Sequence, residues 1–316
     1  MSARLIASMA LTFILLFGVL FAVLVGVGMY FSISAIIMIP IMVLLVIVQW
    51  AIGPRIVRWT TNLRDFEAGE FPWIRQHVED LCRRYDVPMP KLALARMSGP
   101  NAFVFGRTNK SATLAVTQGL LDTLDQNEVK AVIGHEIGHI KHNDMVMMTI
   151  VSAIPIVTYY AAISILYSDT DRKDGFLIFA ILAYVVYFIT TLLVMGFSRL
   201  REYYSDDFGA RATKPAHLAS ALAKITYGLA EKGGKNKSNA VRAFFIADPV
   251  SSASEVSRFS ETYADKYLSK KEVQDAISWE KKSGAMKIME ILRSHPLTFK
   301  RIDALQKIED EMGGSK

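Results

Sequence analysis

The 316-residue sequence contains a single cysteine, Cys82, so no disulfide bond can form within the chain. A zinc site built from several cysteines is excluded for the same reason. Cys82 falls within a helical pattern, which is typical of a packed position. The chain is therefore expected to fold without disulfides in a reducing compartment.

Charge is missing from long parts of the chain. No charged residue occurs from Leu5 to Pro54, and two further charge-free runs cover Met145–Tyr167 and Gly175–Phe197. Charged residues still make up 21% of the chain and hydrophobic residues 52%, so the two populations are segregated. Segregation of this kind excludes a disordered chain, a collagen-like repeat and a small disulfide scaffold. It indicates a membrane protein that carries a substantial soluble domain.

The charge-free runs predict four membrane-spanning helices. The first run turns near Gly26–Gly28 and divides into spans near residues 5–26 and 31–53. The two later runs form a second hairpin around the polar linker 168–174, with Pro155 inside the first arm as a candidate kink. Each run provides the roughly 20 apolar residues that a bilayer requires. A cleaved signal peptide is the alternative for the first run, and a buried soluble helix pair is the alternative for the second hairpin.

Basic residues predict the orientation of these spans. The net charge is +6, and lysines and arginines gather at one set of span ends, whereas Arg172 and Lys173 stand alone on the other side. We therefore expect a multi-pass cell-membrane protein with both termini and the polar segments on the cytoplasmic side, in contact with the lipid bilayer. No nucleic-acid-binding motif accompanies the basic charge, so no nucleic-acid partner is expected.

The expected fold is a membrane α-helical protein with four transmembrane helices and a cytoplasmic α+β domain. Its parts are an N-terminal hairpin (1–53), an α/β segment (54–144), the second hairpin (145–197) and a largely helical segment (198–316). The α/β segment should contain a helix over Phe71–Tyr85, and a second helix that begins near Asp125 with Glu128 at capping-box spacing and runs toward Asp144. Short strands are expected at Lys91–Met97, Ala102–Gly106 and Ala112–Val116, a loop at Glu231–Asn239, a further strand at Val241–Ile246 and helices within 250–293.

The second of these helices carries the motif His135-Glu136-Ile137-Gly138-His139. Residues four apart share one face of a helix, so both imidazoles can reach the same Zn²⁺ ion. Glu136 lies beside the first ligand and can act as general base on a water molecule at the metal. The alternative is a coincidental polar helix face.

A third protein ligand has to come from elsewhere in the chain. His142 shares the face of His135 but lies about 10.5 Å away along the helix axis, too far for one ion with bonds of about 2 Å. Glu202 is the better candidate. The hairpin linker is centred on Asp171, with His139 32 residues before it and Glu202 31 residues after it. If both arms are helical, these two side chains leave the membrane at nearly the same height.

Asp206 follows Glu202 by one helical turn and can orient a ligand histidine through its second ring nitrogen. The alternative for Glu202 is a charge that snorkels at a membrane boundary beside Arg199 and Arg201. Two imidazoles and a carboxylate suit zinc best among the divalent metals, and one ion per chain is expected.

These motifs together resemble the HtpX family of membrane-bound zinc proteases, which are gluzincins related to the CAAX prenyl proteases. The resemblance includes the Asp144-Met145 pair, the run from Arg201 to Asp206, Asn101-Ala102-Phe103, Ala243-Phe244-Phe245, and Ser294-His295-Pro296 with Arg301. It implies zinc ligands at His135, His139 and Glu202 and a catalytic base at Glu136. It also implies a substrate cleft bordered by Asn101, Ala102 and Phe103, where a peptide adds as an extra strand, and an oxyanion-stabilising role for His295 or Arg301. Ser205 departs from the alanine that is common in the family.

The sequence thus favours an integral-membrane zinc endopeptidase that acts on membrane or misfolded polypeptides in protein quality control and stress response. An intramembrane protease is disfavoured because Glu128, Lys130, Lys141 and Asp144 flank the motif. A catalytically silent zinc-binding scaffold or a transporter is the alternative outside proteolysis, although the spans carry no charges and Glu136 is present. The sequence leaves the natural substrates and the oligomeric state open.

Overall fold

The computed structural model describes residues 35–166, 173–231, 278, 281–282 and 289–313. The chain forms two compact units: Met1–Ile52 with Val146–Leu200, called here the helical unit, and Gly53–Met145 with Arg201–Lys316, called the α/β unit. The expected division into four successive segments, with boundaries after residues 53, 144 and 197, remains a prediction. The first span, its glycine turn, the predicted strand near 241–246, and most of the loop after 231 and of 250–293 lie outside the described residues.

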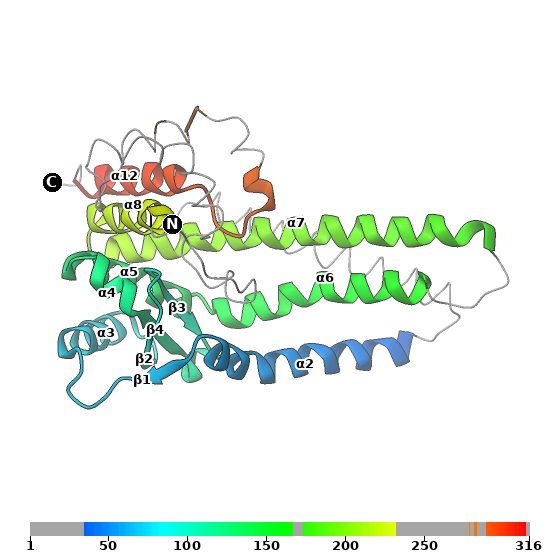
Figure 1. The fold of residues 1–316 in the computed structure, drawn as a ribbon, viewed down its shortest axis with the longest axis horizontal. Helices are drawn as coiled ribbons and strands as arrows, with labels where there is room; N and C mark the ends of the chain where they lie inside the picture. The colour runs from blue at the N-terminus through cyan, green and yellow to red at the C-terminus, as the bar shows by residue number, and fades with distance from the viewer. Residues whose placement is uncertain (1–34, 167–172, 232–277, 279–280, 283–288, 314–316) are drawn as a thin grey trace. The chain divides into compact units, whose positions relative to one another are not determined.

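The helical unit contains most of α2 (Ala35–Thr60), α6 (Asp144–Leu166) and α7 (Lys173–Ala212). Helices α6 and α7 run side by side in Figure 1, and the hydroxyl oxygens of Thr158 and Thr190 lie 3.3 Å apart between them. Val151, Ile154 and Phe197 form a buried cluster in this pair. The second predicted hairpin is therefore a pair of long helices, and Pro155 lies inside α6 as expected from the sequence.

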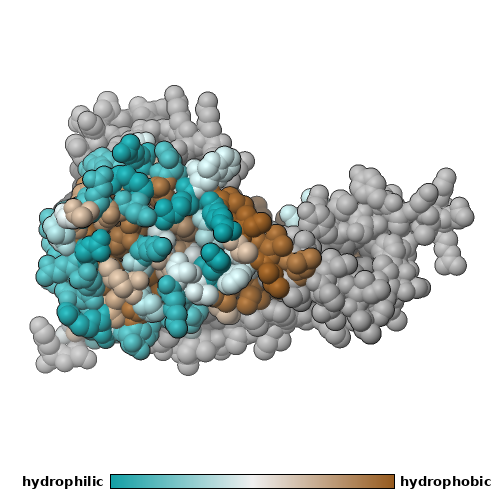
Figure 2. Space-filling view, turned by 90° about the horizontal axis from the view of Figure 1, so that it is seen from below, coloured by the Kyte–Doolittle hydropathy of each residue, from teal (hydrophilic) through white to brown (hydrophobic). Residues whose placement is uncertain are grey.

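Among the described residues, the segment Tyr184–Ala212 is long and apolar enough to cross a membrane, and Asp144–Pro155 is a shorter apolar segment. The expectation of four spans remains a prediction. Figure 2 shows hydrophobic residues gathered in one region of the visible surface and hydrophilic residues in another. Large exposed hydrophobic side chains are typical of a surface that contacts lipid or a partner. On α2 and α7 they include Leu44, Ile47, Ile52, Ile56, Trp59, Ile178, Ile181, Leu182, Val185 and Phe188.

The α/β unit contains a four-stranded sheet with strand order β1-β2-β4-β3. Strand β2 (Lys91–Ala95) pairs in parallel with β4 (Thr113–Thr117), whereas β1 (Leu63–Asp65) and β3 (Ala102–Phe105) pair antiparallel with β2 and β4. Strands β2, β3 and β4 confirm the three predicted strands to within two residues. Strand β1 was not predicted, because three residues are too few to show an alternating pattern. Strand β3 is left at one edge of the sheet.

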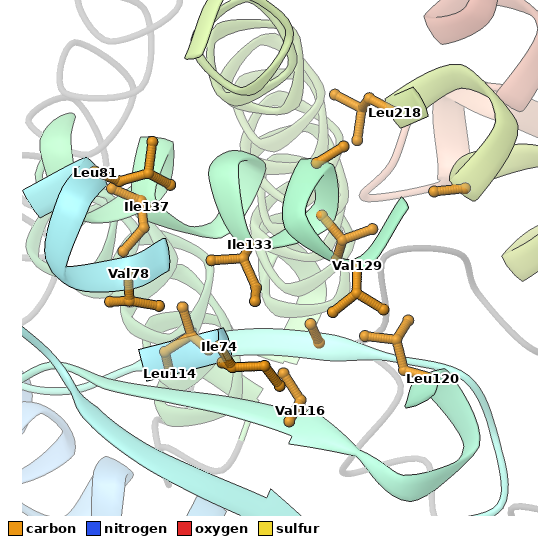
Figure 3. Close-up of a cluster of buried hydrophobic side chains, with 14 of the residues drawn as sticks. Ile74, Val78, Leu81, Leu114, Val116, Leu120, Val129, Ile133, Ile137 and Leu218 are labelled. Carbon is orange, nitrogen blue, oxygen red and sulfur yellow. The ribbon is translucent and has the colours of Figure 1, made fainter. Parts of the chain in front are cut away.

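Alternate residues of the strands supply two cores, as the period of a strand requires. Leu114 and Val116 of β4 face a cluster built with α3 (Pro72–Tyr85), α4 (Gln118–Thr123), α5 (Gln126–Lys141) and α8 (Pro215–Glu231), as Figure 3 shows. Phe103, Phe105 and Ala115 face the opposite side with Val57 of α2. Helix α5, which carries the motif, is therefore supported by the sheet beneath it and by α3 and α8 beside it. The remaining short elements are η1 (Asn109–Ser111), η3 (Glu290–Leu292) and α12 (Thr298–Gly313), and α12 packs on α8.

The N-terminus of α5 is fixed by the predicted capping box. The Asp125 carboxylate accepts hydrogen bonds from the backbone N–H groups of Asn127 and Glu128 at 2.8 and 3.0 Å. The Glu128 carboxylate accepts one from the backbone N–H of Asp125 at 3.0 Å. It also contacts Ser220 and Lys224 of α8, both at 2.6 Å. These bonds satisfy N–H groups that a helix start leaves without a partner and tie α5 to α8.

The buried position of Cys82 predicts an inert thiol. Burial raises the pKa of this thiol to about 11, so the reactive thiolate is scarce at pH 8. We expect the folded protein to react with a thiol reagent such as dithionitrobenzoate at least about tenfold more slowly than the denatured protein at that pH. Equal rates of reaction before and after denaturation would show that Cys82 is accessible.

Candidate metal centre and active site

Small residues let α5 and α7 approach each other closely. Gly134 and Gly138 on α5 face Gly209 and Ser205 on α7. A Cβ atom built on Gly209 would lie 2.7 Å from the backbone nitrogen of His135 and 2.9 Å from its Cα. A Cβ atom on Gly138 would lie 3.1 Å from the Cα of Ser205. The two backbones therefore approach closely at this crossing, and the histidine face of α5 lies against α7.

This crossing brings the three predicted ligands together. The Nε2 atoms of His135 and His139 lie 3.1 Å apart. Glu202 on α7 places Oε2 3.7 Å from the Nε2 of His135 and Oε1 3.7 Å from the Nε2 of His139. His135 and Glu202 are almost fully buried, and His139 is slightly exposed. Glu202, which follows His139 by 63 residues and His135 by 67, therefore lies beside both histidine side chains.

These side chains fit a divalent metal ion. Donor atoms around a tetrahedral zinc ion with bonds of about 2.0–2.1 Å are separated by about 3.3 Å, close to the 3.1 and 3.7 Å found here. The Oε2 atom of Glu202 is buried and accepts no hydrogen bond of normal geometry from the described residues. Four buried carboxyl groups also lie near only two buried guanidinium groups, an imbalance that a divalent cation would offset. The carboxyl groups belong to Glu136, Asp144, Glu202 and Asp206, and the guanidinium groups belong to Arg201 and Arg301.

Glu136 lies within the same cluster. Its carboxylate and the two histidine rings each offer a ligand-type atom, and these atoms lie within 4.8 Å of one another. Burial, and then the nearby Glu202 carboxylate, raise the pKa of Glu136 well above its ordinary value. Burial lowers the pKa of His135, and it lowers the pKa of His139 to about 4. Both rings are therefore neutral at physiological pH, which is the form that ligates a metal.

Asp206 and Arg301 form a buried network behind the histidines. The Oδ1 atom of Asp206 lies 2.9 Å from the Nδ1 of His135, a distance at which a carboxylate can orient this ring. Arg301 on α12 donates to both carboxylate oxygens of Asp206, at 2.8 and 2.7 Å, and its NH1 group lies 3.2 Å from the Oε2 of Glu202. The Nδ1 of His295 lies 3.3 Å from the same Oε2 atom. Arg301, expected near the oxyanion, is thus bound to two carboxylates.

The sequence did not predict the contacts of His139 with Asp144 and Ser205, or the pairing of Asp144 with Arg201. The Oδ2 atom of Asp144 lies 2.7 Å from the Nδ1 of His139, and the hydroxyl of Ser205 lies 2.9 Å from it. Arg201 forms an ion pair with Asp144. The sequence offered one signal for the Asp144 contact, a carboxylate five residues after His139 at the start of the next helix. To predict the contact from it, the conformation of the turn between α5 and α6 has to be known, and the sequence pattern does not define that turn.

The predicted substrate segment lies on the edge strand. Asn101, Ala102 and Phe103 are all buried, and the ring of Phe103 packs near that of Phe105, with centroids 6.0 Å apart. These side chains therefore support the sheet, and any contact with a peptide has to come from the backbone of β3. Strand β3 also packs against α5, so this edge belongs to the same unit as the metal-type cluster.

His142 caps the C-terminal end of α5. Its ring packs edge-on against Tyr204, with ring centroids 5.4 Å apart. It is therefore a partly buried aromatic contact, away from the Nε2 atoms of the candidate ligands.

A helix with the His-Glu-x-x-His motif, packed against a second helix that contributes a glutamate, defines a metallopeptidase of the gluzincin type. The sequence profile of "Peptidase family M48" matches residues 68–309. A protease HtpX homologue of Methanothermobacter thermautotrophicus is 40% identical over 223 residues, which cover 70% of this chain and 85% of the relative. A protease HtpX homologue of Methanosarcina mazei is 32% identical over 292 residues, which cover 90% and 88% of the two chains.

The chain belongs to peptidase family M48, among the HtpX-type proteases. This membership confirms the predicted family and the predicted metalloprotease activity, and it supports a membrane zinc metalloprotease. The crystal structure of S. mikatae Ste24p is similar in fold, with a TM-score of 0.54 at 18% identity over 96% of this chain and 67% of that chain. The fold is therefore Ste24-like.

The close crossing of α5 and α7 predicts that Gly209 does not tolerate a side chain. Gly209→Ala pushes a methyl group into the backbone of His135, which should cost about 1–3 kcal/mol of stability and lower zinc content and protease activity. Gly53→Ala is the matched control, because a Cβ atom there meets nothing within 4 Å in the described structure. Thermal unfolding and metal analysis of both purified variants test this. Equal zinc content and stability in the two variants would show that the crossing is looser.

Proposed function

We propose that this protein is an integral-membrane zinc endopeptidase that hydrolyses peptide bonds of membrane or misfolded proteins at the cytoplasmic face of the cell membrane. The observation that carries this proposal is the convergence of His135, His139 and Glu202 around Glu136 in a buried site of an M48-family chain. His135, His139 and Glu202 are the proposed ligands of one zinc ion per chain. When bound, this ion would polarise the scissile carbonyl and lower the pKa of a water molecule.

Glu136 is the proposed general base. Its carboxylate takes a proton from the attacking water and returns it to the leaving amine nitrogen. This assignment is supported by its burial beside both histidine rings, where its carboxylate lies within reach of a water molecule at the metal. Asp206 holds the ring of His135 through Nδ1 and leaves Nε2 for the metal.

His295 is the proposed partner of the oxyanion that forms at the scissile carbonyl. Its Nδ1 atom lies 3.3 Å from the Oε2 of Glu202, beside the candidate ligands. An imidazole N–H group at this place can donate to a developing negative charge. Arg301 contributes mainly by holding Asp206 and Glu202, since its guanidinium group already contacts both.

The proposed substrate site is strand β3, which lies at the edge of the described sheet, with Asn101 just before it and Ala102 and Phe103 at its start. A polypeptide in extended form adds there as a further strand, held by backbone hydrogen bonds. This mode of binding places few demands on the side chains of the substrate, which suits an enzyme that removes varied membrane or unfolded polypeptides. Support comes from the edge position of β3 and from its packing against α5.

Replacement of Glu136 by Gln removes the base and keeps the size of the side chain. We expect Glu136→Gln to bind zinc and to lose casein cleavage by about 100- to 10,000-fold. Wild-type protein should lose activity on chelation and regain it with added zinc, whereas the variant should stay inactive. Wild-type protein that holds no metal, or a variant that cleaves at the wild-type rate, would refute the proposed mechanism.

The same experiment separates the enzyme from the silent zinc-binding scaffold or transporter. A scaffold would bind zinc in both proteins and cleave in neither. The transporter alternative is tested separately, in an assay of zinc uptake into vesicles that contain the protein. An endopeptidase is expected to move no zinc across the membrane.

The cytoplasmic orientation is tested with a single introduced cysteine. Lys110→Cys lies on an exposed turn of the α/β unit, and the buried Cys82 adds no background. A membrane-impermeant maleimide should leave it unlabelled in intact cells and label it in inverted membrane vesicles. Labelling in intact cells would place this unit on the outer side.

A further inference from the structure

His139 contacts different groups through its two ring nitrogens. Its Nε2 atom faces the Nε2 of His135 at 3.1 Å and Glu202 at 3.7 Å, which is the metal side. Its Nδ1 atom faces the Oδ2 of Asp144 at 2.7 Å. A carboxylate at this distance accepts the Nδ1–H proton, and the Nε2 lone pair then points toward the metal side.

The turn between α5 and α6 brings Asp144 to this position. Helix α5 ends at Lys141 and α6 begins at Asp144, so only two residues connect them. Asn143 has φ of +60°, a left-handed conformation that asparagine tolerates better than most residues. Its side-chain oxygen accepts a hydrogen bond from Asn109 at 2.8 Å. The turn returns the first residue of α6 toward the last turn of α5, where His139 lies.

Arg201 holds the Asp144 carboxylate from α7. The two side chains are buried and form an ion pair, and Arg201 also donates to the backbone carbonyl of His142 at 3.0 Å. A buried carboxylate of this kind keeps its charge only when it is paired. Because Arg201 immediately precedes Glu202, α7 supplies both a candidate ligand and the cation that secures Asp144.

The two ligand histidines therefore have matching supports. His135 contacts Asp206, which is held by Arg301, and His139 contacts Asp144, which is held by Arg201. We propose that Asp144, secured by Arg201, is a positioning residue that fixes the tautomer and ring orientation of His139 for metal binding. This inference rests on the proposed function, in which His139 ligates zinc.

Ser205 is the rival partner, since its hydroxyl lies 2.9 Å from the same Nδ1 atom. A carboxylate accepts a stronger hydrogen bond than a hydroxyl, so Asp144 is expected to dominate. Variants of the full-length protein purified in detergent separate the two. Asp144→Asn keeps the size of the side chain and removes its charge, Ser205→Ala removes the hydroxyl, and Asp207→Asn is the matched control, a carboxylate on α7 that pairs with Arg211.

The measured quantities are zinc affinity, by competition with a chromogenic chelator, and the unfolding temperature of the metal-free protein. We expect Asp144→Asn to weaken zinc binding about 10- to 100-fold and Ser205→Ala and Asp207→Asn to leave it within about threefold. The visible spectrum of the cobalt-substituted protein should change in Asp144→Asn alone, a shift that a purely structural role would not produce. If the single variant unfolds, Asp144→Asn with Arg201→Gln removes both buried charges and is expected to show the same loss of affinity.

Wild-type zinc affinity in Asp144→Asn, or in the double variant, would overturn the proposal for Asp144 and leave the peptidase assignment intact. A loss of affinity in Ser205→Ala equal to that in Asp144→Asn would also overturn it. Absence of zinc binding by the wild-type protein would instead refute the proposed function itself.

Discussion

The close crossing of α5 and α7 is the contact on which the rest of the site depends. Glycines at positions 134, 138 and 209 and the small Ser205 let the two backbones approach closely. Without this approach, Glu202 and Asp206 would be a side-chain width further from His135. The crossing therefore sets the distances between Glu202 and the two candidate ligand histidines, and the distance between Asp206 and His135. The fit of the site to a metal thus depends on the packing of small residues as well as on the types of the candidate ligands.

Buried charge is organised in pairs around this crossing. Each candidate ligand histidine contacts a carboxylate, and each carboxylate contacts an arginine from another part of the chain. Such pairs are costly to bury, and they are stable only when their hydrogen bonds are complete. Glu202 contacts Arg301 as well, so Asp206 and Glu202 share one guanidinium group, and a divalent cation would offset the remaining negative charge.

Much of this site could be predicted from the sequence because its elements have local signals. The four-residue spacing of His135 and His139, the capping box at Asp125 and the symmetric distances of His139 and Glu202 from the hairpin centre each follow from helix geometry. Strand β1 and helix α4 were missed, since three and six residues are too few to show a period. The roles of Asp144 and Arg301 depend on a two-residue turn and on long-range docking, which no local pattern encodes.

Arg301 is 95 residues from Asp206 in the sequence, and its guanidinium group contacts both Asp206 and Glu202. A contact between groups so distant in the sequence forms only after α12 has docked beside α7. The support behind His135 is therefore completed by tertiary assembly of the α/β unit, and local helix formation alone does not provide it.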